Sequence, residues 1–329
     1  MTTDQLQNKT AHFAFLLVSE YSMIAISSAI EPLRMANRIS EKKLYEWSIV
    51  TFDGNPVTAS NGLIIHPDHS LDNMPSIDVL FVCSGLNVSR YFSKPLKTAL
   101  CKLAKQLTTL GSLCTGAYLL ARCGLLDNYR CTLHWEHIAS MREEFPQIQL
   151  TDELFEVDRD RYTCAGGSAP LDMMLGLISR DHSISLSNDI SEQFMCDRIR
   201  GHHDRQRIPL HLQLGTNQTK LTEAVTLMEA NIEEPISLED LAHYVGISRR
   251  QLERLFRKHL DCVPTRYYMN IRLKRARLLL LQTSKPIIDV ALACGFVSAP
   301  HFSKCYRDLF YISPREERSK PQDKLNINT

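Results

Sequence analysis

A cysteine stands alone where a short apolar run meets the start of a helix, in the segment GSLCTGAYLLARCGLL at residues 111–126. The run ends at Leu113, Cys114 follows, and Thr115 and Gly116 lead into an apolar stretch with helical spacing. A thiol on such a strand-to-helix turn lies at the positive end of the helix dipole, where the thiolate is favoured. The pattern is that of a nucleophile elbow, which suits either covalent catalysis or the binding of an anionic group.

Covalent catalysis at Cys114 would require a base to activate the thiol and an acid to orient that base. The position directly after the cysteine holds Thr115 and not a histidine. His182 in SRDHS does not match the expected position of a catalytic base, and His134 in HWEH is more typical of a pocket lining. We therefore predict no catalytic residue. Cys114 and the amides of its turn are interpreted as the lining of a small-molecule pocket, with an inert, packed thiol as the alternative.

Strand-like and helix-like segments alternate through the first 200 residues and would position this turn. We expect strands at 13–18, 47–52, 77–85 and 131–133, helices at 26–36, at 93–107 and from Pro170, and a hairpin at 154–167. The alternation predicts an α/β sandwich around a mostly parallel sheet, in which ligands bind at the carboxyl ends of the strands. Ser84, Gly85 and Cys114 fall at such ends.

Length and composition are ordinary for a globular protein. With 329 residues the chain is too long for one typical core, which predicts two domains. The longest apolar runs are shorter than a membrane span and the polar N-terminus lacks a signal-peptide pattern, so we expect a cytoplasmic protein without a membrane association. Ten irregularly spaced cysteines without a C-x-x-C pair favour reduced thiols. His134 and His137 lack a second ligand pair at metal spacing, so we expect no metal and no cofactor.

Basic residues are concentrated near the C-terminus. From residue 216 onward the chain carries 18 Lys and Arg against 13 Asp and Glu, whereas the earlier part carries 20 against 24. Between residues 248 and 277 ten side chains are basic and only two are acidic. This asymmetry predicts a polyanion-binding module joined to a nearly neutral domain. The segment 201–217, with its Gly, Pro and charges, is the expected linker.

The C-terminal part contains an internal repeat with an offset of 49 to 50 residues. Its matching positions are Ala242, Gly246, Ser248, Leu252, Phe256 and Pro264 in the first copy, and Ala291, Gly295, Ser298, Phe302, Tyr306 and Pro314 in the second. Each copy predicts a helix-turn-helix. The small Ala lets two helices approach, Gly supplies a turn residue with positive φ, Ser caps the second helix, and the apolar stripe seats that helix on the core.

The second helix of each copy leaves a largely basic face free. A solvated surface would explain one such helix, but two capped and repeated basic helices favour DNA binding. The free faces carry Arg249, Arg250, Glu253, Arg254 and Arg257 in the first copy, and Ala299, Pro300, His301, Lys304 and Arg307 in the second. Residues 266–283 predict a long amphipathic helix that spaces these two helices for successive major grooves.

The stretch from ISLEDLAHYVG to FYISPREER resembles the DNA-binding domain of AraC-type transcription regulators, over residues 218 to about 318. In that family the base-reading positions lie early on the second helix of each motif. Here this implies Arg250, Glu253 and Arg254, and then Ala299, Pro300, His301 and Lys304. Arg suits the O6 and N7 acceptors of guanine, and Glu can accept from cytosine N4. The second motif is expected to read more by methyl and phosphate contacts.

The first part of the chain resembles the ThiJ/PfpI-like, class I glutamine amidotransferase-type fold on the segments EPLRMAN, VCSG, CTGAYLLARCGLL, LHWEH and GGSAPLDMML. Combined with AraC-type helices, this is typical of GlxA-like regulators. The implied fold class is α/β, a flavodoxin-like α/β/α sandwich followed by an all-α domain with two helix-turn-helix motifs. The expected boundaries are 1–200 for the effector-sensing domain, 201–217 for the linker, 218–320 for the DNA-binding domain and 321–329 for a polar tail.

Phrases such as SLDN, LMEAN and FVSAPHFSKCYR are similar to those of glycine-betaine-responsive activators of choline and betaine catabolism. The resemblance implies a transcription regulator, not an enzyme, that responds to glycine betaine or dimethylglycine. The expected partners are double-stranded operator DNA, the effector, RNA polymerase and a second copy of the chain in a homodimer. Two alternatives stay open: a regulator of carnitine or arginine metabolism, and a thiol-dependent amidase or protease that uses Cys114.

A betaine-type ligand would place its carboxylate at the elbow and its trimethylammonium against an aromatic face. The expected ligand-binding residues are Cys114, Thr115, Gly116, Tyr118, His134, Trp135 and Glu31. Glu31 is expected as an acidic partner of Cys114 or of the ligand cation. The simpler interpretations are a core position for Trp135 and a helix cap for Glu31.

Overall fold

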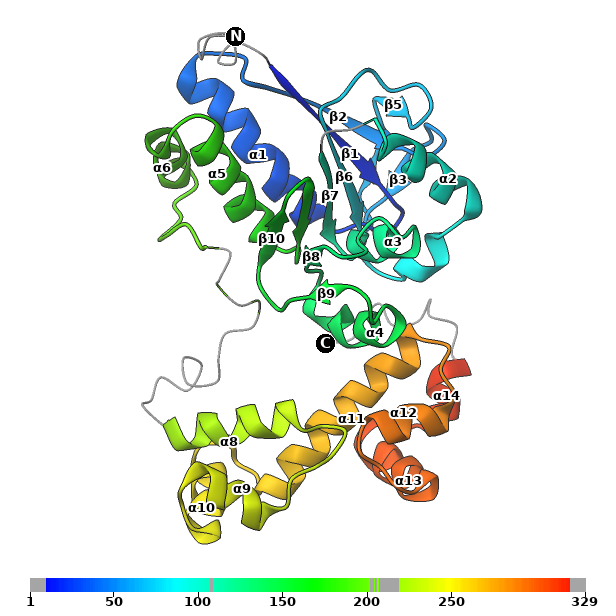
Figure 1. Ribbon diagram of the computed structural model, residues 1–329, viewed down its shortest axis with the longest axis vertical. Helices are drawn as coiled ribbons and strands as arrows, with labels where there is room; N and C mark the ends of the chain where they lie inside the picture. Colours follow the sequence, from blue (N-terminus) through cyan, green and yellow to red (C-terminus); the bar gives the residue numbers. More distant parts are fainter. Residues whose placement is uncertain (1–9, 107–108, 202–203, 205, 207–218, 320–329) are drawn as a thin grey trace. The chain divides into compact units, whose positions relative to one another are not determined.

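The computed structural model describes residues 10–106, 109–201, 204, 206 and 219–319. The chain forms two compact units, Met1–Gln206 and Arg207–Thr329 (Figure 1). The division falls inside the segment 201–217. Most of that segment, and the whole of the tail expected at 321–329, lie outside the described residues.

A seven-stranded sheet with the order β10-β11-β7-β6-β1-β2-β5 forms the centre of the first unit. Its strands are β1 (Ala11–Leu17), β2 (Tyr45–Thr51), β5 (His69–Ser70), β6 (Val79–Ser84), β7 (Thr109–Cys114), β10 (Phe155–Asp158) and β11 (Arg161–Cys164). Neighbouring strands are parallel except β10 and β11, which form the hairpin expected at 154–167. The central strands are almost wholly buried, as their unbroken apolar sequences predict.

Helices cover both faces of this sheet and enclose two apolar cores (Figure 1). One face carries α1 (Met23–Ser40), α5 (Ala169–Asp181) and α6 (Ile184–Gln193). The other carries α2 (Lys94–Leu103), α3 (Gly116–Arg122) and α4 (Trp135–Glu144). This α/β/α sandwich confirms the predicted fold class of the first domain.

Smaller elements lie around the sheet. The strand expected at 131–133 is β8 (Arg130–Cys131), which pairs with β9 (Gln149–Leu150) in a separate two-stranded sheet. A further antiparallel pair consists of β3 (Val57–Thr58) and β4 (Ile64–Ile65), and η2 (Val88–Tyr91) is a short 3₁₀ turn after β6.

The turn at Cys114 has the sharp strand-to-helix geometry that the sequence predicts. Cys114 ends β7 with a φ of 57°, and α3 begins two residues later. Non-glycine residues with positive φ are uncommon and gather at functional sites. Glu20 and Asn87, which lie shortly after β1 and β6, share this conformation, and the Asn87 amide donates a hydrogen bond of 2.9 Å to the Glu20 carboxylate. Cys114 therefore shares the carboxyl edge of the sheet with two further non-glycine residues of positive φ.

The second unit is helical throughout its described residues. Its helices are α8 (Thr219–Ala230), α9 (Leu238–Val245), α10 (Arg249–Leu260), α11 (Pro264–Gln282), α12 (Ile287–Ala293), α13 (Ala299–Phe310) and α14 (Pro314–Ser319). The pairs α9–α10 and α12–α13 are the two expected helix-turn-helix copies, and α11 runs between them (Figure 1). With 19 residues, α11 is about 28 Å long.

The turns and caps of the repeat confirm the predicted roles of its residues. Gly246 and Gly295 have φ values of 73° and 75°. The Ser248 and Ser298 hydroxyls accept hydrogen bonds from the amides three residues further on, which caps α10 and α13. The stripe that seats these helices is fully buried and consists of Leu252, Phe256, Phe302 and Tyr306.

Candidate functional site

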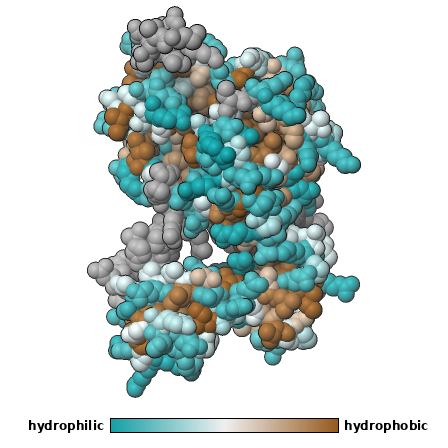
Figure 2. All heavy atoms as spheres, in the orientation of Figure 1, coloured by the Kyte–Doolittle hydropathy of each residue, from teal (hydrophilic) through white to brown (hydrophobic). Residues whose placement is uncertain are grey.

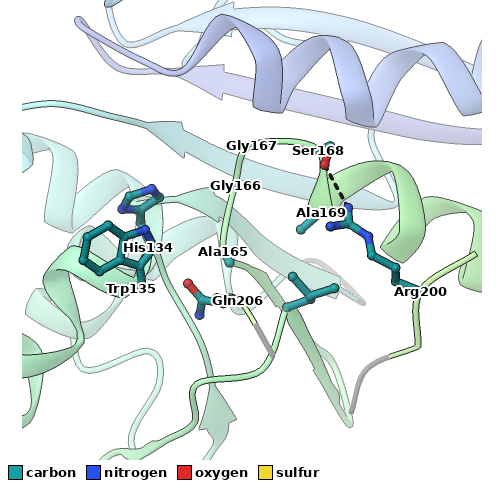
Figure 3. A pocket seen from close by; sticks show the side chains of 10 residues that line it. His134, Trp135, Ala165, Gly166, Gly167, Ser168, Ala169, Arg200 and Gln206 are labelled. Atoms are coloured by element: carbon teal, nitrogen blue, oxygen red, sulfur yellow. Dashed lines mark hydrogen bonds between the residues drawn. The ribbon is translucent and has the colours of Figure 1, made fainter. Parts of the chain in front are cut away.

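A cavity of about 220 Å³ lies beside the carboxyl edge of the sheet in the first unit (Figure 3). This volume is below the range of drug-sized ligands and suits a small metabolite. Its wall comes from the start of α4, the loop between β11 and α5, and the residues that end the unit. The lining residues are His134, Trp135, Leu154, Ala165, Gly166, Gly167, Ser168, Ala169, Arg200 and Gln206.

The elbow supports this cavity without lining it. The His134 amide donates a hydrogen bond of 3.3 Å to the Cys114 carbonyl. Gly166 lies against the cysteine, because a Cβ added there would come within 2.7 Å of the Cys114 Cβ and 3.0 Å of its sulfur. Of the described residues, the cavity wall does not include Cys114, Thr115 or Gly116. The elbow therefore positions two wall residues instead of presenting its thiol.

Burial dominates the chemistry of the Cys114 thiol. Desolvation raises the pKa of this thiol to about 12, although a hydrogen bond from the Thr115 amide lowers it, and the Glu136 carboxylate raises it further. The expectation of a favoured thiolate, drawn from the helix dipole alone, is therefore wrong, because the cost of burying the charge is larger. At neutral pH the protonated thiol is a poor nucleophile.

Arg200 brings a positive charge to one end of the cavity. Its Nε and Nη2 donate to Oδ2 of Asp172 at 2.9 and 2.6 Å, and Nη2 also donates to the Ser168 hydroxyl at 2.8 Å (Figure 3). Its backbone amide donates to the other Asp172 oxygen at 2.7 Å. Of the described residues, none accepts from Nη1, so two of the five guanidinium donors remain available.

Gln206 contributes a buried acceptor. Its Nε2 lies 2.9 to 3.0 Å from the Thr132 hydroxyl and the Leu133 and Glu153 carbonyls, which fixes the orientation of the amide. Its Oε1 is buried and has no hydrogen-bond partner among the described residues. Leaving such an acceptor unpaired costs about 1–3 kcal/mol. A ligand that brings a donor or a positive charge to this oxygen would recover part of that cost.

Two aromatic rings form the opposite end of the cavity. The centroids of the His134 and Trp135 rings lie 5.7 Å apart, and Trp135 is 40% exposed. Burial lowers the pKa of His134, although the Glu136 carboxylate 3.7 Å away raises it, so the imidazole is neutral at pH 7. This end therefore presents uncharged aromatic surface.

The remaining residues expected to bind ligand have other partners. The Tyr118 hydroxyl donates to Glu144 at 3.2 Å, and the Tyr118 ring packs in the core that α3 covers. The Glu31 carboxylate pairs with Arg34 at 2.6 Å along α1, which accounts for this side chain without Cys114. The Thr115 hydroxyl donates to the Gly85 carbonyl at 2.7 Å. Of the described residues, only His134 and Trp135 belong both to the predicted set and to the cavity wall.

The sequence analysis missed Arg200 and Gln206. Both lie far from the elbow in sequence, and Gln206 falls in the segment that was interpreted as a linker. One signal was available. Asp172 is an acidic residue in the apolar helix that follows GGSAP, and a buried acidic side chain requires a charged or hydrogen-bonding partner.

In the first helix-turn-helix, α10 presents the expected basic face. Arg249 forms ion pairs within the motif, with Glu239 and with Glu253, the latter at 3.1 Å. Glu253 is thereby engaged as well. The exposed arginines of α10 that pair with no acidic side chain in the described chain are Arg250, Arg254 and Arg257. These three guanidiniums are available to phosphates or base edges.

In the second helix-turn-helix the corresponding surface is less charged. Pro300, Lys304 and Arg307 are exposed and Ala299 is half-buried, while the exposed His301 ring lies 3.3 Å from the Cys305 sulfur. Figure 2 shows hydrophilic side chains gathered over α10 and hydrophobic ones over α12 and α13. The exposed apolar residues in this second region are Ile288, Leu292 and Val297.

Known proteins match both units. Residues 14–180 match the DJ-1/PfpI family, and residues 241–320 match a helix-turn-helix domain. The HTH-type transcriptional regulator GlxA of Rhizobium meliloti is 33% identical over 93% of this chain and 95% of its own length. The HTH-type transcriptional regulator GbdR of Pseudomonas aeruginosa is 54% identical over 92% of this chain and 83% of its own length. The chain belongs to the GlxA-like AraC-family transcriptional regulators.

Membership in this family decides the role of the second unit. The regulator binds DNA through its helix-turn-helix motifs and is not an enzyme. A crystal structure of an AraC family transcriptional regulator from Pseudomonas putida, 31% identical, covers 56% of this regulator and 99% of that chain with a TM-score of 0.51. Among the helices that the structure describes, none has the length and apolarity needed to span a bilayer.

Proposed function

We propose that this regulator binds glycine betaine or dimethylglycine in its first unit and activates genes of choline and betaine catabolism. The identity of 54% to the regulator GbdR over nearly the whole chain carries the proposal. The segments EPLRMAN, GGSAPLDMML and FVSAPHFSKCYR, which resemble those of glycine-betaine-responsive activators, support it. Since its target is DNA, the proposal also includes a cytoplasmic location, a homodimer and contact with RNA polymerase.

The proposed division of labour follows the expected boundaries. Residues 1–200 sense the effector, residues 201–217 link, and residues 218–320 bind DNA. A ligand with different affinities for two arrangements of these parts would bias how the helix-turn-helix motifs are presented to the operator.

The proposed DNA contacts place α10 and α13 in successive major grooves. The length of α11, about 28 Å, is comparable with the roughly 34 Å of one turn of DNA, which supports this spacing. The exposed Arg250 and Arg254 suit guanine edges. Glu253 forms an ion pair with Arg249, and it would have to break this pair before its carboxylate could accept a hydrogen bond from cytosine. The other proposed contacts are Arg249, Arg257, Ala299, Pro300, His301, Lys304 and Arg307.

A thermal-shift screen of the full-length protein against betaine, dimethylglycine, carnitine and arginine tests the effector. A ligand at a hundred times its Kd stabilises the folded state by about 2.7 kcal/mol, so selective stabilisation by betaine or dimethylglycine is the expected result. Selective stabilisation by carnitine or arginine would replace the effector. Turnover of amide or peptide substrates that is lost in Cys114→Ala, without specific DNA binding, would contradict the regulator itself.

A further inference from the structure

We propose that the cavity at the start of α5 is the effector site and holds a small zwitterion in one orientation. The ligand carboxylate lies at Arg200, and its methylated ammonium lies between Trp135 and Oε1 of Gln206. The inference rests on the proposed function for the ligand class, and it adds the site, its residues and the direction in which the ligand lies.

The Arg200 end of the cavity is prepared for a carboxylate. Asp172, which is 4% exposed, holds the guanidinium through two of its nitrogens, so little side-chain freedom remains to be lost on binding. The Nη1 donors remain for the ligand, as argued above. Ser168 and Ala169 place the N-terminal end of the 13-residue helix α5 in the same wall, which adds positive potential.

The opposite end of the cavity is prepared for a cation. The rings of His134 and Trp135 are uncharged at neutral pH, and an indole face attracts a methylated ammonium through cation–π interaction. In Figure 3 these rings lie on one side of the labelled group and Arg200 on the other, with the Gln206 amide between them. The unpaired Oε1 of Gln206 adds a negative partial charge to the cation's surroundings.

These two ends select the class of ligand. A ligand with only a carboxylate would recover none of the cost of the unpaired Gln206 oxygen, which the unoccupied cavity already carries. A ligand with only a cationic group would meet the Arg200 guanidinium. A zwitterion satisfies both ends, and the cavity of about 220 Å³ limits it to a small one.

Gln206 also distinguishes between the two proposed effectors. The protonated nitrogen of dimethylglycine carries one N–H, which can donate to Oε1, whereas the quaternary nitrogen of betaine carries none. Loss of this acceptor should therefore weaken dimethylglycine more than betaine.

The site lies near the end of the first unit along the chain. Gln206 is the last residue of the first unit, and Arg200 lies six residues before it. A zwitterion held between Trp135 and Arg200 would therefore bind close, along the chain, to the end of the first unit.

Isothermal titration of the full-length regulator with betaine and with dimethylglycine tests the site. Because Arg200→Gln alone would leave Asp172 buried and unpaired, the variant is the double substitution Arg200→Gln with Asp172→Asn. We expect this variant and Trp135→Leu to bind both zwitterions at least tenfold more weakly. Gln206→Leu should weaken dimethylglycine several-fold more than betaine.

Two matched controls should bind like the wild type. Arg198→Gln removes an exposed arginine that pairs with Asp204 at 2.8 Å outside the cavity wall. Tyr118→Phe removes a hydroxyl expected at the ligand but bonded to Glu144. If the double variant does not fold, as judged by circular dichroism, the Trp135→Leu result decides alone, because that side chain is 40% exposed.

The outcomes separate the two levels of the proposal. Wild-type protein that binds neither zwitterion would overturn the proposed effector class. Wild-type protein that binds one, with unchanged affinity in Trp135→Leu and in the double variant, would overturn the cavity assignment and leave the proposed function standing.

Discussion

The two helix-turn-helix copies have the same backbone arrangement but differ in the side chains that pack in their cores. In the first copy Phe256 and Tyr267 pack edge to face, with ring centroids 5.5 Å apart. Fifty residues later the same positions hold Tyr306 and Glu317, and the Tyr306 hydroxyl donates a hydrogen bond of 2.9 Å to the Glu317 carboxylate. Glu317 is 1% exposed and also accepts from Arg277 at 3.2 Å. One copy thus has an apolar core where the other has a buried charge network.

The exposed faces of the copies differ as well. Arg250 and Arg254 in the first correspond to Pro300 and Lys304 in the second. A guanidinium can bind a guanine edge with two parallel hydrogen bonds, whereas an ammonium acts as a point charge that suits phosphate. The turn glycines and capping serines are the same in both copies, because the repeated backbone needs them. The residues of the core and of the exposed face differ between the copies.

The largest difference between the copies should appear on removal of the buried carboxylate. Glu317→Ala leaves Arg277 without its partner and Tyr306 without its acceptor, and breaking a buried pair in this way costs about 3–5 kcal/mol. We expect a loss of about 3 kcal/mol, since Arg277 is only half-buried. Urea denaturation monitored by circular dichroism measures it.

Arg315→Ala is the matched control on the same helix, because Arg315 is exposed. It should change the free energy of unfolding by less than about 0.5 kcal/mol. Glu317→Gln, which keeps an acceptor for Tyr306, should fall between the two. Equal stability of Glu317→Ala and the control would show that the second core does not depend on its charge network.

The turn glycines provide the next comparison. Gly246 and Gly295 have nearly the same φ, so Ala at either position carries left-handed strain of about 1–2 kcal/mol. A Cβ at Gly246 meets no atom within 4 Å, whereas one at Gly295 would lie 2.6 Å from the Ile232 carbonyl and 2.7 Å from the Pro235 ring. Overpacking adds about 1–3 kcal/mol.

We therefore expect Gly295→Ala to destabilise the protein by about 2–5 kcal/mol and Gly246→Ala by about 1–2 kcal/mol. Thermal unfolding of the two variants side by side gives the difference. The same melting temperature for both would mean that the backbone near Ile232 moves away without cost.

On DNA, the larger effect should come from the first copy. Arg254→Ala should cost about 1–3 kcal/mol of operator binding and relax the preference for one base pair, because an exposed arginine on a reading helix suits a base edge. Lys304→Ala, at the same position of the second copy, should weaken binding to all sequences alike and reduce the salt slope by about one. Titrations of operator and unrelated DNA at several salt concentrations separate these results. A uniform loss in Arg254→Ala would identify it as a phosphate contact.

The repeat made the second unit largely predictable from sequence. An offset of 49 to 50 residues identified the turn glycines, the capping serines and the buried stripe, because each has a specific physical role in a helix-turn-helix. Glu317 gave no such signal, since in PREERS it is indistinguishable from its exposed neighbours. Nor did Asp261 and Tyr311, which end α10 and α13 with positive φ at equivalent positions. Tertiary contacts and helix endings determine these residues, and side-chain type does not reveal them.

The first unit was predictable in its sheet and less so in its cavity. Continuous apolar runs identified the parallel strands, and the Cys114 turn had the predicted geometry. The state of its thiol was not predictable, because the degree of burial outweighs the dipole. Arg200 and Gln206 come to the cavity from a segment without periodic pattern, and only the folded chain brings them beside His134 and Trp135.

The smallest expected difference concerns the helix caps. Ser248 takes part in a capping box, in which the Gln251 side chain accepts a hydrogen bond from the Ser248 amide, whereas Ser298 caps α13 without such a return bond because His301 occupies the third helical position. Replacement of an N-cap serine by Ala costs about 1 kcal/mol. Ser248→Ala keeps this backbone bond but removes the hydrogen bond of 3.1 Å that the Ser248 hydroxyl donates to Gln251 Oε1. It should therefore cost slightly more than Ser298→Ala, by a few tenths of a kcal/mol. Gln251→Ala should lower the cost of Ser248→Ala to that of Ser298→Ala in a double-mutant cycle. Equal costs without this substitution would mean that the hydrogen bond from the Ser248 hydroxyl to Gln251 contributes nothing.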